Sequence, residues 1–143
     1  MNLPDENEKR FVAIVNKKIE LGKLMNALGH CATGLASSYK DHTELCILPY
    51  SDKENNTHGP ISHFPFIVLK AENSNQIRSV KSECVARGIP FSDFTHTMTL
   101  GTTEEQLTAT LNKTDDELEY YSIVLFGKTE EIKQFTRKFS LLH

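Results

Sequence analysis

The sequence predicts an α/β protein, a sandwich of helices around a small, mostly parallel sheet. Two observations predict this class. Short apolar segments of strand length recur along the chain, and segments with apolar residues at helical spacing lie between them. Strands that alternate with helices form βαβ units, in which the strands run parallel.

Length and composition indicate one globular domain. A chain of 143 residues is long enough to bury roughly two-thirds of its unfolded surface in a single core. Hydrophobic residues make up 38% and charged residues 24% of the sequence, which is typical of a globular protein. We expect residues 1–10 to form a polar N-terminal extension and residues 11–143 to form the domain.

No segment of the sequence is suited to a membrane or to export. The apolar runs fall short of the roughly 20 residues that span a bilayer, and the first ten residues are polar and acidic, unlike a secretory signal. Cys31, Cys46 and Cys84 are an odd number without close spacing, which does not fit a disulfide framework. We therefore expect a cytoplasmic protein without a membrane partner.

The first predicted elements are a strand and a long helix. Residues 11–15 (FVAIV) are an uninterrupted apolar run, as in a strand that is buried on both faces. Residues 24–39 follow as a helix without any Asp, Glu, Lys or Arg. An apolar stripe runs along it at helical spacing: Leu24, Leu28, Cys31, Leu35 and Tyr39. Four polar residues share another face: Asn26, His30, Thr33 and Ser37.

Two glycines lie inside this helix, Gly29 and Gly34, and each costs about 1 kcal/mol relative to Ala. We attribute them to close approach of a second layer, a partner or a ligand. Two interpretations of the helix stay open: buried packing without chemistry, and a functional polar face that includes His30.

A short strand is expected at residues 45–48, followed by a loop over residues 51–63, which are rich in Asn, Asp, Gly, Pro and His. The next strand starts at residue 66 and ends at residue 71, because Pro65 excludes an earlier start. Ser74 then caps a helix that Gly88 ends.

The second half of the chain continues the alternation. A short strand is expected at residues 90–94 and a helix from Thr103, which has capping-box spacing to Gln106. Residues 121–126 (YSIVLF) form the next strand after a charged loop. Thr129 opens a final helix whose inward residues are Ile132, Phe135, Phe139 and Leu142.

Two motif-like features do not support a nucleotide or metal site. The Gly-Lys-Thr segment at residues 127–129 resembles the end of a P-loop, but Ser122 replaces the first glycine of that motif. Four zinc-binding side chains lack the spacing of a zinc site: His42, Cys46, His58 and His63. We therefore expect no metal and no other cofactor.

The best candidate site combines the first βα turn with the segment after residues 90–94. Ligands of α/β proteins bind at the carboxyl ends of the strands, where the helix N-terminus and Lys23 favour an anion. His96 as a base, Lys23 at the oxyanion and Thr99 form the candidate catalytic set. The candidate binding residues are Gly22, Asn26, His30 and Thr97. The alternative is that His96 and the threonines are ordinary polar residues.

The opening of the chain resembles a known superfamily. The segment FVAIVNKKIELGKLMNALGHCATGLA is similar to the start of the peptidyl-tRNA hydrolase II superfamily, in which an apolar strand leads to a Gly-Lys turn and a small-residue helix with a histidine. From about residue 11 to the C-terminus, the chain resembles a bacterial family of unassigned function within that superfamily. The other matching parts are the His-Gly-Pro stretch before HFPFIVLKA, then IPFSDFTHTM and SIVLFGKTEEIKQFTRKFSLLH.

This resemblance implies a three-layer α/β/α fold with a four-stranded mixed sheet. In the hydrolases, the lysine of the Gly-Lys turn, the region of the helix histidine, and an aspartate and a threonine after the second helix are associated with the active site. Lys23 and His30 match the first two positions. His96 stands in the place of the aspartate, and Leu100 stands in that of the threonine, beside Thr99.

A further departure is Leu21, which replaces the first lysine of the repeated Gly-Lys turn. These departures argue against peptidyl-tRNA hydrolysis as the reaction, and a net charge of −3 weakens the case for transfer RNA as a partner. The leading hypothesis is a polar cleft around Lys23 and His96 that binds a small anionic ligand or hydrolyses an ester. A non-catalytic binding module and a homodimer formed through the uncharged helix are the alternatives.

Overall fold

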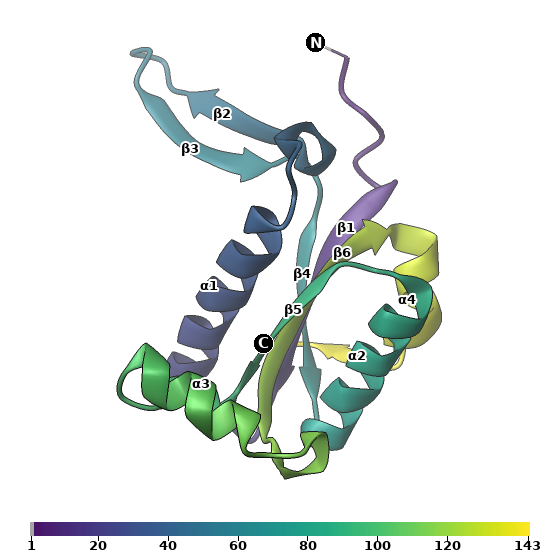
Figure 1. Ribbon diagram of the computed structural model, residues 1–143. Helices are drawn as coiled ribbons and strands as arrows, with labels where there is room; N and C mark the ends of the chain where they lie inside the picture. Colours follow the sequence, from purple (N-terminus) through teal and green to yellow (C-terminus); the bar gives the residue numbers. More distant parts are fainter. Residues whose placement is uncertain (1) are drawn as a thin grey trace.

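The structure is a computed structural model that describes residues 2–143. Within those residues, four α-helices and a five-stranded sheet make up the body, and a two-stranded hairpin projects from it (Figure 1). The strands of the body are β1 (Lys9–Asn16), β4 (Phe66–Ala71), β5 (Phe91–Thr95), β6 (Tyr120–Lys128) and β7 (Ser140–Leu141). The helices are α1 (Leu21–Ser37), α2 (Ser74–Arg87), α3 (Thr103–Leu111) and α4 (Thr129–Thr136).

The sheet has the strand order β5-β6-β1-β4-β7 and is mixed. β1 and β4 are parallel, whereas β6 is antiparallel to β1 and β5, and β7 is antiparallel to β4. The predictions of a mostly parallel sheet and of about four strands are therefore wrong. The reason is that β6 starts beside the end of β5, where Thr95 pairs with Tyr120, so the chain does not cross back before β6 begins.

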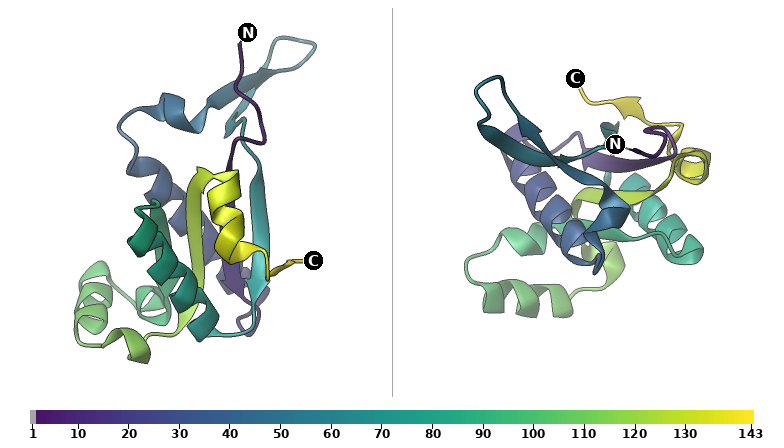
Figure 2. Two further views of the ribbon diagram at one scale, coloured as in Figure 1. Left: turned by 90° about the vertical axis from the view of Figure 1, so that its right-hand side faces the viewer. Right: turned by 90° about the horizontal axis from the view of Figure 1, so that it is seen from above.

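Helices lie on both faces of the sheet (Figure 2). On one face, α1 buries its apolar stripe: Leu24, Ala27, Cys31 and Leu35. On the other face, α2 and α4 bury Ile77, Val80, Cys84 and Ile132. β1 serves both cores, because Ala13 and Val15 face α1 while Val12 and Ile14 face α2. This two-sided burial explains why the apolar run of β1 is uninterrupted.

The predicted long helix is confirmed as α1, which begins at Leu21 and ends at Ser37. Its polar residues, Asn26, His30, Thr33 and Ser37, are all exposed, so this face is not buried packing within the chain. Gly34 closely approaches a neighbour, because a Cβ there would lie 3.0 Å from Ser92 Oγ, whereas a Cβ at Gly29 would meet nothing within 4 Å.

The hairpin consists of β2 (Ile47–Ser51) and β3 (Thr57–Ser62), which form a sheet of their own. The predicted strand at residues 45–48 is thus shifted, and the predicted loop over residues 51–63 is wrong, since half of it is β3. Pro49 in β2 and Gly59 and Pro60 in β3 interrupt the side-chain alternation that identifies a strand. A short 3₁₀ helix, η1 (His42–Leu45), joins α1 to the hairpin.

Helix caps differ by one residue from their predictions. Asn73 caps α2 in place of Ser74, and Thr102 caps α3 in place of Thr103. Gly88 ends α2 as predicted, with a φ of 66° in the left-handed region that favours glycine. Each observed cap accepts a hydrogen bond from a backbone amide in the first turn, which offsets the loss of intrahelical partners there.

The last helix is shorter than predicted. α4 starts at Thr129 but ends at Thr136, so Phe139 and Leu142 lie beyond it. The chain then pairs along β4 as β7, and the amide of Leu142 donates to the carbonyl of Val68 at 3.0 Å. At the other end, β1 starts at Lys9, two residues before the predicted domain boundary. In residues 2–143, no helix combines the length and apolar character that crossing a bilayer requires.

Candidate functional site

A pocket of about 420 Å³ opens at the edge of the sheet where β1, β4 and β5 end. It lies between α1 and the segment that leads from η2 (His96–Thr99) into α3. Five of the predicted site residues line it: Gly22, Lys23, Asn26, His30 and Thr99. We call this hollow the Lys23 pocket. Its position agrees with the expectation that ligands bind beyond the carboxyl ends of the strands.

The N-terminus of α1 has no side-chain cap. Its N-cap residue, Glu20, makes no capping hydrogen bond, and the first turn contains no acidic residue. By contrast, Asn73 caps α2 and Thr102 caps α3. The first amides of a helix have no partner inside the helix and carry partial positive charge. At α1, these amides remain available to an anionic group that enters the pocket.

Lys23 adds a full positive charge to this end of the pocket. Within residues 2–143, its ammonium group makes no ion pair and no side-chain hydrogen bond, and neither does the exposed side chain of Asn26. Lys23 shares this with most lysines of residues 2–143, because only Lys17, Lys81 and Lys133 form ion pairs there. The pocket therefore presents a cation that the protein itself does not neutralise.

His30 forms the middle of the pocket wall. Its imidazole stacks on the ring of Phe94, with the ring centroids 5.8 Å apart and the planes inclined by 25°. His30 also lines a second hollow of about 280 Å³, which shares His30, Met98 and Gln106 with the Lys23 pocket. The two hollows together follow α1 from its first turn to Cys31. This arrangement settles that His30 faces solvent and the pocket rather than the core.

The far wall of the pocket comes from η2 and α3. Thr99 Oγ1 donates to the carbonyl of His96 at 2.6 Å, and Gln106 Nε2 donates to the carbonyl of Leu100 at 2.6 Å. These bonds hold the turn between η2 and α3 in place. Met98, Leu100, Gln106 and Tyr121 were absent from the predicted site. Only Tyr121 had a sequence signal, because it starts an apolar strand directly after a charged loop.

Two predicted site residues lie outside the Lys23 pocket. Thr97 is fully buried, and its hydroxyl lies 2.7 Å from the hydroxyls of both Thr95 and Thr110. His96 does not line the pocket either, because its Nδ1 accepts a hydrogen bond from the amide of Glu119 at 3.0 Å. Thr97 thus joins η2 to α3, and His96 is not among the residues that line the pocket with Lys23.

Cys31 is poorly suited to act as a nucleophile, although it lines the second hollow. Burial raises the pKa of its thiol to about 11, and its Sγ lies 3.4 Å from Ser122 Oγ. Because the thiolate is the reactive form, the thiol is almost entirely protonated at neutral pH. The same holds for Cys84, whose pKa burial raises to about 12.

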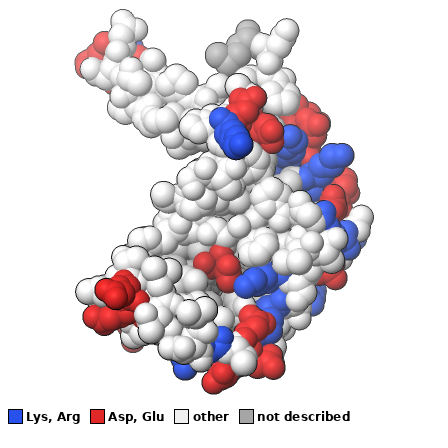
Figure 3. All heavy atoms as spheres, in the orientation of Figure 1, with Lys and Arg blue, Asp and Glu red and all other residues white. Residues whose placement is uncertain are grey.

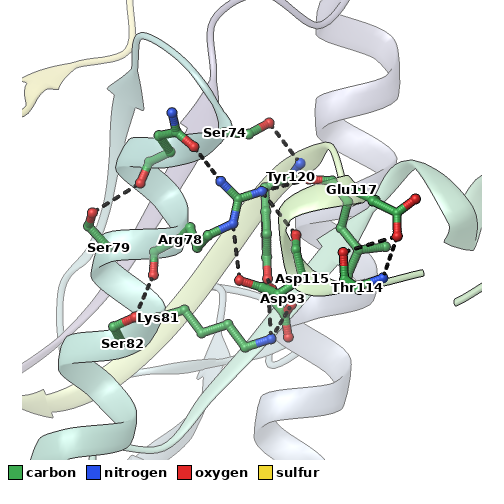
Figure 4. Close-up of polar contacts among 12 residues, drawn as sticks. Ser74, Arg78, Ser79, Lys81, Ser82, Asp93, Thr114, Asp115, Glu117 and Tyr120 are labelled. Carbon is green, nitrogen blue, oxygen red and sulfur yellow. Dashed lines mark hydrogen bonds and ion pairs between the residues drawn. The ribbon is translucent and has the colours of Figure 1, made fainter. Parts of the chain in front are cut away.

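A charged network joins α2, β5 and the 3₁₀ turn η3 (Asp115–Glu117) on the α2 side of the sheet (Figure 4). The buried Tyr120 donates its hydroxyl proton to Asp115 and lies 3.4 Å from Lys81 Nζ. Lys81 pairs with Asp93 at 3.3 Å, and Arg78 pairs with Asp115 at 3.0 Å. Desolvation raises the pKa of Tyr120, so the phenol stays protonated. Most of these groups contact an opposite charge or a hydrogen-bond partner within the network, which favours a structural role, although Arg78 Nε is buried without a hydrogen-bond partner.

Another hollow, of about 550 Å³, lies between α2 and α4. Glu83 on its wall pairs with Arg87 at 2.9 Å, and Arg87 in turn donates to Gln134 at 2.8 Å. Arg137 and Lys138 on the same wall form no ion pair within residues 2–143, and the hollow lies away from the edge where β1 and β4 end. Among residues 2–143, no group of three or more potential metal ligands gathers in one place. His58 instead contacts Asp52, and His63 contacts the carbonyl of Pro4.

Comparison with known proteins gives a family and a fold. The family model described as "Protein of unknown function (DUF2000)" matches residues 9–143. No curated protein matched the sequence. A solved structure of a protein of unknown function, Atu0240 from Agrobacterium tumefaciens strain C58, superposes with a TM-score of 0.80 over 95% of this chain and 98% of that chain, at 17% sequence identity. At this identity, the likeness shows a shared fold alone.

Proposed function

Since the chain belongs to the DUF2000 family, whose function is unknown, we propose from its own geometry that it binds a small anionic ligand, a carboxylate or a phosphate, in the Lys23 pocket. One observation carries this proposal. The uncapped N-terminus of α1 and the ammonium group of Lys23, which has no partner within residues 2–143, line the same pocket.

The two positive features act on one ligand group. A helix N-terminus stabilises a negative charge by about 0.3–1 kcal/mol at an exposed site and by up to about 2 kcal/mol in a partly buried one. Lys23 supplies a charge-assisted hydrogen bond, the stronger kind. Met98, Leu100 and Tyr121 line the rest of the pocket. The preferred ligand is therefore an organic acid or phosphate ester with an apolar or aromatic part, rather than a bare inorganic ion.

NMR titration tests this proposal with two probes, inorganic phosphate and acetate. We expect the backbone amides of Gly22, Lys23 and Leu24 to shift on addition of either probe. Lys23→Ala should weaken binding by roughly 5- to 30-fold, since it removes about 1–2 kcal/mol of charge-assisted contact. Lys18→Ala is the matched control, because Lys18 precedes the same helix but lines a different hollow.

Two outcomes would overturn the anion proposal. One is a titration in which the amides of the first turn of α1 do not shift at any probe concentration. The other is equal weakening by Lys23→Ala and Lys18→Ala, which would indicate screening by general surface charge. Repeating the titrations of both variants at two salt concentrations separates binding in the pocket from screening of the general surface charge.

Ester hydrolysis is the second candidate, and His30 is the observation that favours it. His30 is the imidazole that lines the pocket, and the sequence resemblance to peptidyl-tRNA hydrolase II rests on the same helix. In this reaction His30 accepts a proton from water as the water oxygen attacks the ester carbonyl carbon, and Lys23 stabilises the oxyanion. The bond to the leaving oxygen then breaks, and the imidazolium returns the proton to that oxygen.

Single-turnover hydrolysis of a peptidyl-tRNA tests the second candidate. If the protein is a hydrolase, His30→Ala and Lys23→Ala should each lower the rate by about 100-fold or more. His96→Ala should leave the rate within about twofold, because His96 lies outside the pocket lining. Absence of cleavage above buffer excludes this reaction and leaves the anion-binding proposal in place.

A further inference from the structure

Eight of the twelve large hydrophobic residues that are exposed in residues 2–143 form two groups near the ends of α1, and the other four, Leu3, Phe66, Val85 and Leu141, belong to neither group. One group, the hairpin group, lies beyond the C-terminal end of α1: Ile47, Tyr50 and Ile61. The other, the body group, lies on the first turns of α1, on α3 and on the residue that follows η2: Leu21, Met25, Leu100, Leu107 and Leu111. Figure 1 shows the hairpin above one end of α1 and α3 beside the other end.

The hairpin has no core of its own. Leu48 and Ile61 are paired across the two strands, whereas Tyr50 pairs with His58 beyond a shift in the strand register. Ile61 remains 57% exposed and Tyr50 50% exposed. A two-stranded hairpin is marginally stable in water unless another surface covers its apolar face. Nothing within residues 2–143 covers this face, which indicates that it packs against another molecule.

The surface between the two groups is almost free of charge (Figure 3). Neither β2 nor β3 contains Asp, Glu, Lys or Arg, and residues 24–39 contain none either. Burial of an unpaired charge is costly. The strands of the hairpin and residues 24–39 carry no charge, whereas α3 carries Glu104 and Glu105 in its first turn. The hairpin and the exposed side of α1 are thus electrostatically suited to each other.

We propose that the chain forms a two-fold symmetric dimer in which each hairpin packs on the body group of the other copy. The two groups lie at opposite ends of α1, so a two-fold axis perpendicular to that helix brings each hairpin to the partner's body group. β2, β3 and α3 contain 5, 6 and 9 residues. With the exposed side of α1 they reach the roughly 20–30 residues per subunit of a standard interface.

Sedimentation equilibrium between about 1 and 500 µM, a range that brackets micromolar dissociation constants, tests the dimer. We expect a species of twice 16.2 kDa. Ile61→Asp and Leu107→Asp should each raise the dissociation constant at least tenfold. Both side chains are more than half exposed, so thermal unfolding should show both variants folded. Val85→Asp, at a 65% exposed position on α2, is the control and should leave dimerisation unchanged.

Mixing the two variants tests the arrangement itself. In the mixture, the intact hairpin of Leu107→Asp meets the intact body group of Ile61→Asp, so one of the two contacts is restored and heterodimers should form more strongly than either homodimer. A monomer at every concentration overturns the proposal. So does a dimer that neither substitution weakens, because another face must then form it. Failure of the mixture to recover association overturns the exchange of hairpins.

Discussion

His96 and Glu119 form a reciprocal backbone and side-chain pair. The amide of His96 donates to the carbonyl of Glu119 at 2.9 Å, and the amide of Glu119 donates to Nδ1 of His96 at 3.0 Å. These bonds join the end of β5 to the start of β6. Because Nδ1 accepts a hydrogen bond, the neutral imidazole carries its proton on Nε2. The pair makes His96 a structural residue of the sheet edge.

His96→Ala should lower the free energy of unfolding by about 0.5–1.5 kcal/mol, the usual net value of one hydrogen bond. The check is urea unfolding followed by circular dichroism. His96→Asn should recover most of the loss, because an amide oxygen can accept the same hydrogen bond. If alanine and asparagine destabilise equally, the hydrogen bond to Glu119 is not what His96 contributes.

The two glycines of α1 should respond differently to alanine. Gly29→Ala should stabilise the protein by about 0.5–1 kcal/mol, because helix propensity improves and the new methyl group meets nothing within 4 Å. Gly34→Ala should stabilise the protein less than Gly29→Ala does, or should destabilise it, since the new Cβ would lie 3.0 Å from Ser92 Oγ. Chemical denaturation of both variants measures the difference.

Adding Ser92→Ala to Gly34→Ala should restore the helix-propensity gain, because it removes the atom that the new methyl group meets. An equal gain from both single substitutions would show that Ser92 moves aside at no cost. A loss at Gly29 would mean that this exposed face packs against something in solution, and its dependence on protein concentration would then identify the dimer.

Tyr120→Phe should destabilise the protein by about 1.5–3 kcal/mol, the range for hydrogen bonds to charged groups, because the Tyr120 hydroxyl contacts Asp115 and Lys81. Urea unfolding monitored at two wavelengths provides the value. Tyr39→Phe is the control, since within residues 2–143 its hydroxyl makes no hydrogen bond. Equal effects of the two substitutions would contradict a role for the network in stability.

Alkaline pH should weaken the fold through the buried thiols. In the unfolded chain a cysteine has a pKa near 9, whereas burial raises the pKa of Cys31 to about 11 and that of Cys84 to about 12. Above pH 9 the unfolded state therefore loses protons that the native state keeps. Stability falls by up to about 1.4 kcal/mol per pH unit for each thiol until the pH reaches its folded value.

The check is the urea midpoint of the wild type and of Cys84→Ala between pH 8 and about 10.5, a range that crosses the unfolded thiol pKa. The variant should be less stable at pH 8, because it leaves a small cavity, and should lose less stability as the pH rises. If the urea midpoints of the two proteins fall equally as the pH rises, Cys84 is not a cause of the loss of stability at alkaline pH.

Asp52 organises the tip of the hairpin. Its carboxylate contacts His58 Nε2 at 2.9 Å and accepts from the amides of Glu54 and Asn56, and the His58 contact is the largest cause that lowers its pKa to about 2. We expect His58→Ala to raise the pKa of Asp52, as followed by NMR titration of its carboxyl carbon. Lys53→Ala is the control, and an unchanged pKa in His58→Ala would contradict the assignment.

Sequence patterns predicted the elements whose side chains follow a clear apolar period. β1, α1, β4 and β6 were within reach because their buried residues recur at strand or helix spacing. β3 could not be predicted in this way, because Gly59 and Pro60 interrupt its side-chain alternation and because the strand faces solvent. Whether neighbouring strands run parallel or antiparallel depends on the path of the chain that connects them. The alternation of strands and helices in the sequence does not show that α3 and η3 remain at the sheet edge where β5 ends. Because they do, β6 starts at that edge and runs antiparallel to β5.

The site was predictable where one helix face or one sheet edge determines it. Lys23, Asn26 and His30 share a side of α1, and Thr99 follows a strand that ends at the same edge. His96 does not line the pocket, and the reason is local. Alternation along β5 puts it on the side of Phe94, but the pairing with β6 shifts at Thr95 and a 3₁₀ turn begins at His96. Spacing alone carries no sign of such a shift.

Pro49 and Pro60 have a consequence for the protein at high concentration. Each lacks an amide hydrogen, so neither edge of the hairpin can offer a complete ladder of donors to an added strand. Exposed strands with a full ladder recruit further chains and grow into fibrous aggregates. The two prolines allow the hairpin to present apolar side chains to solvent or to a partner while its backbone remains a poor template for amyloid.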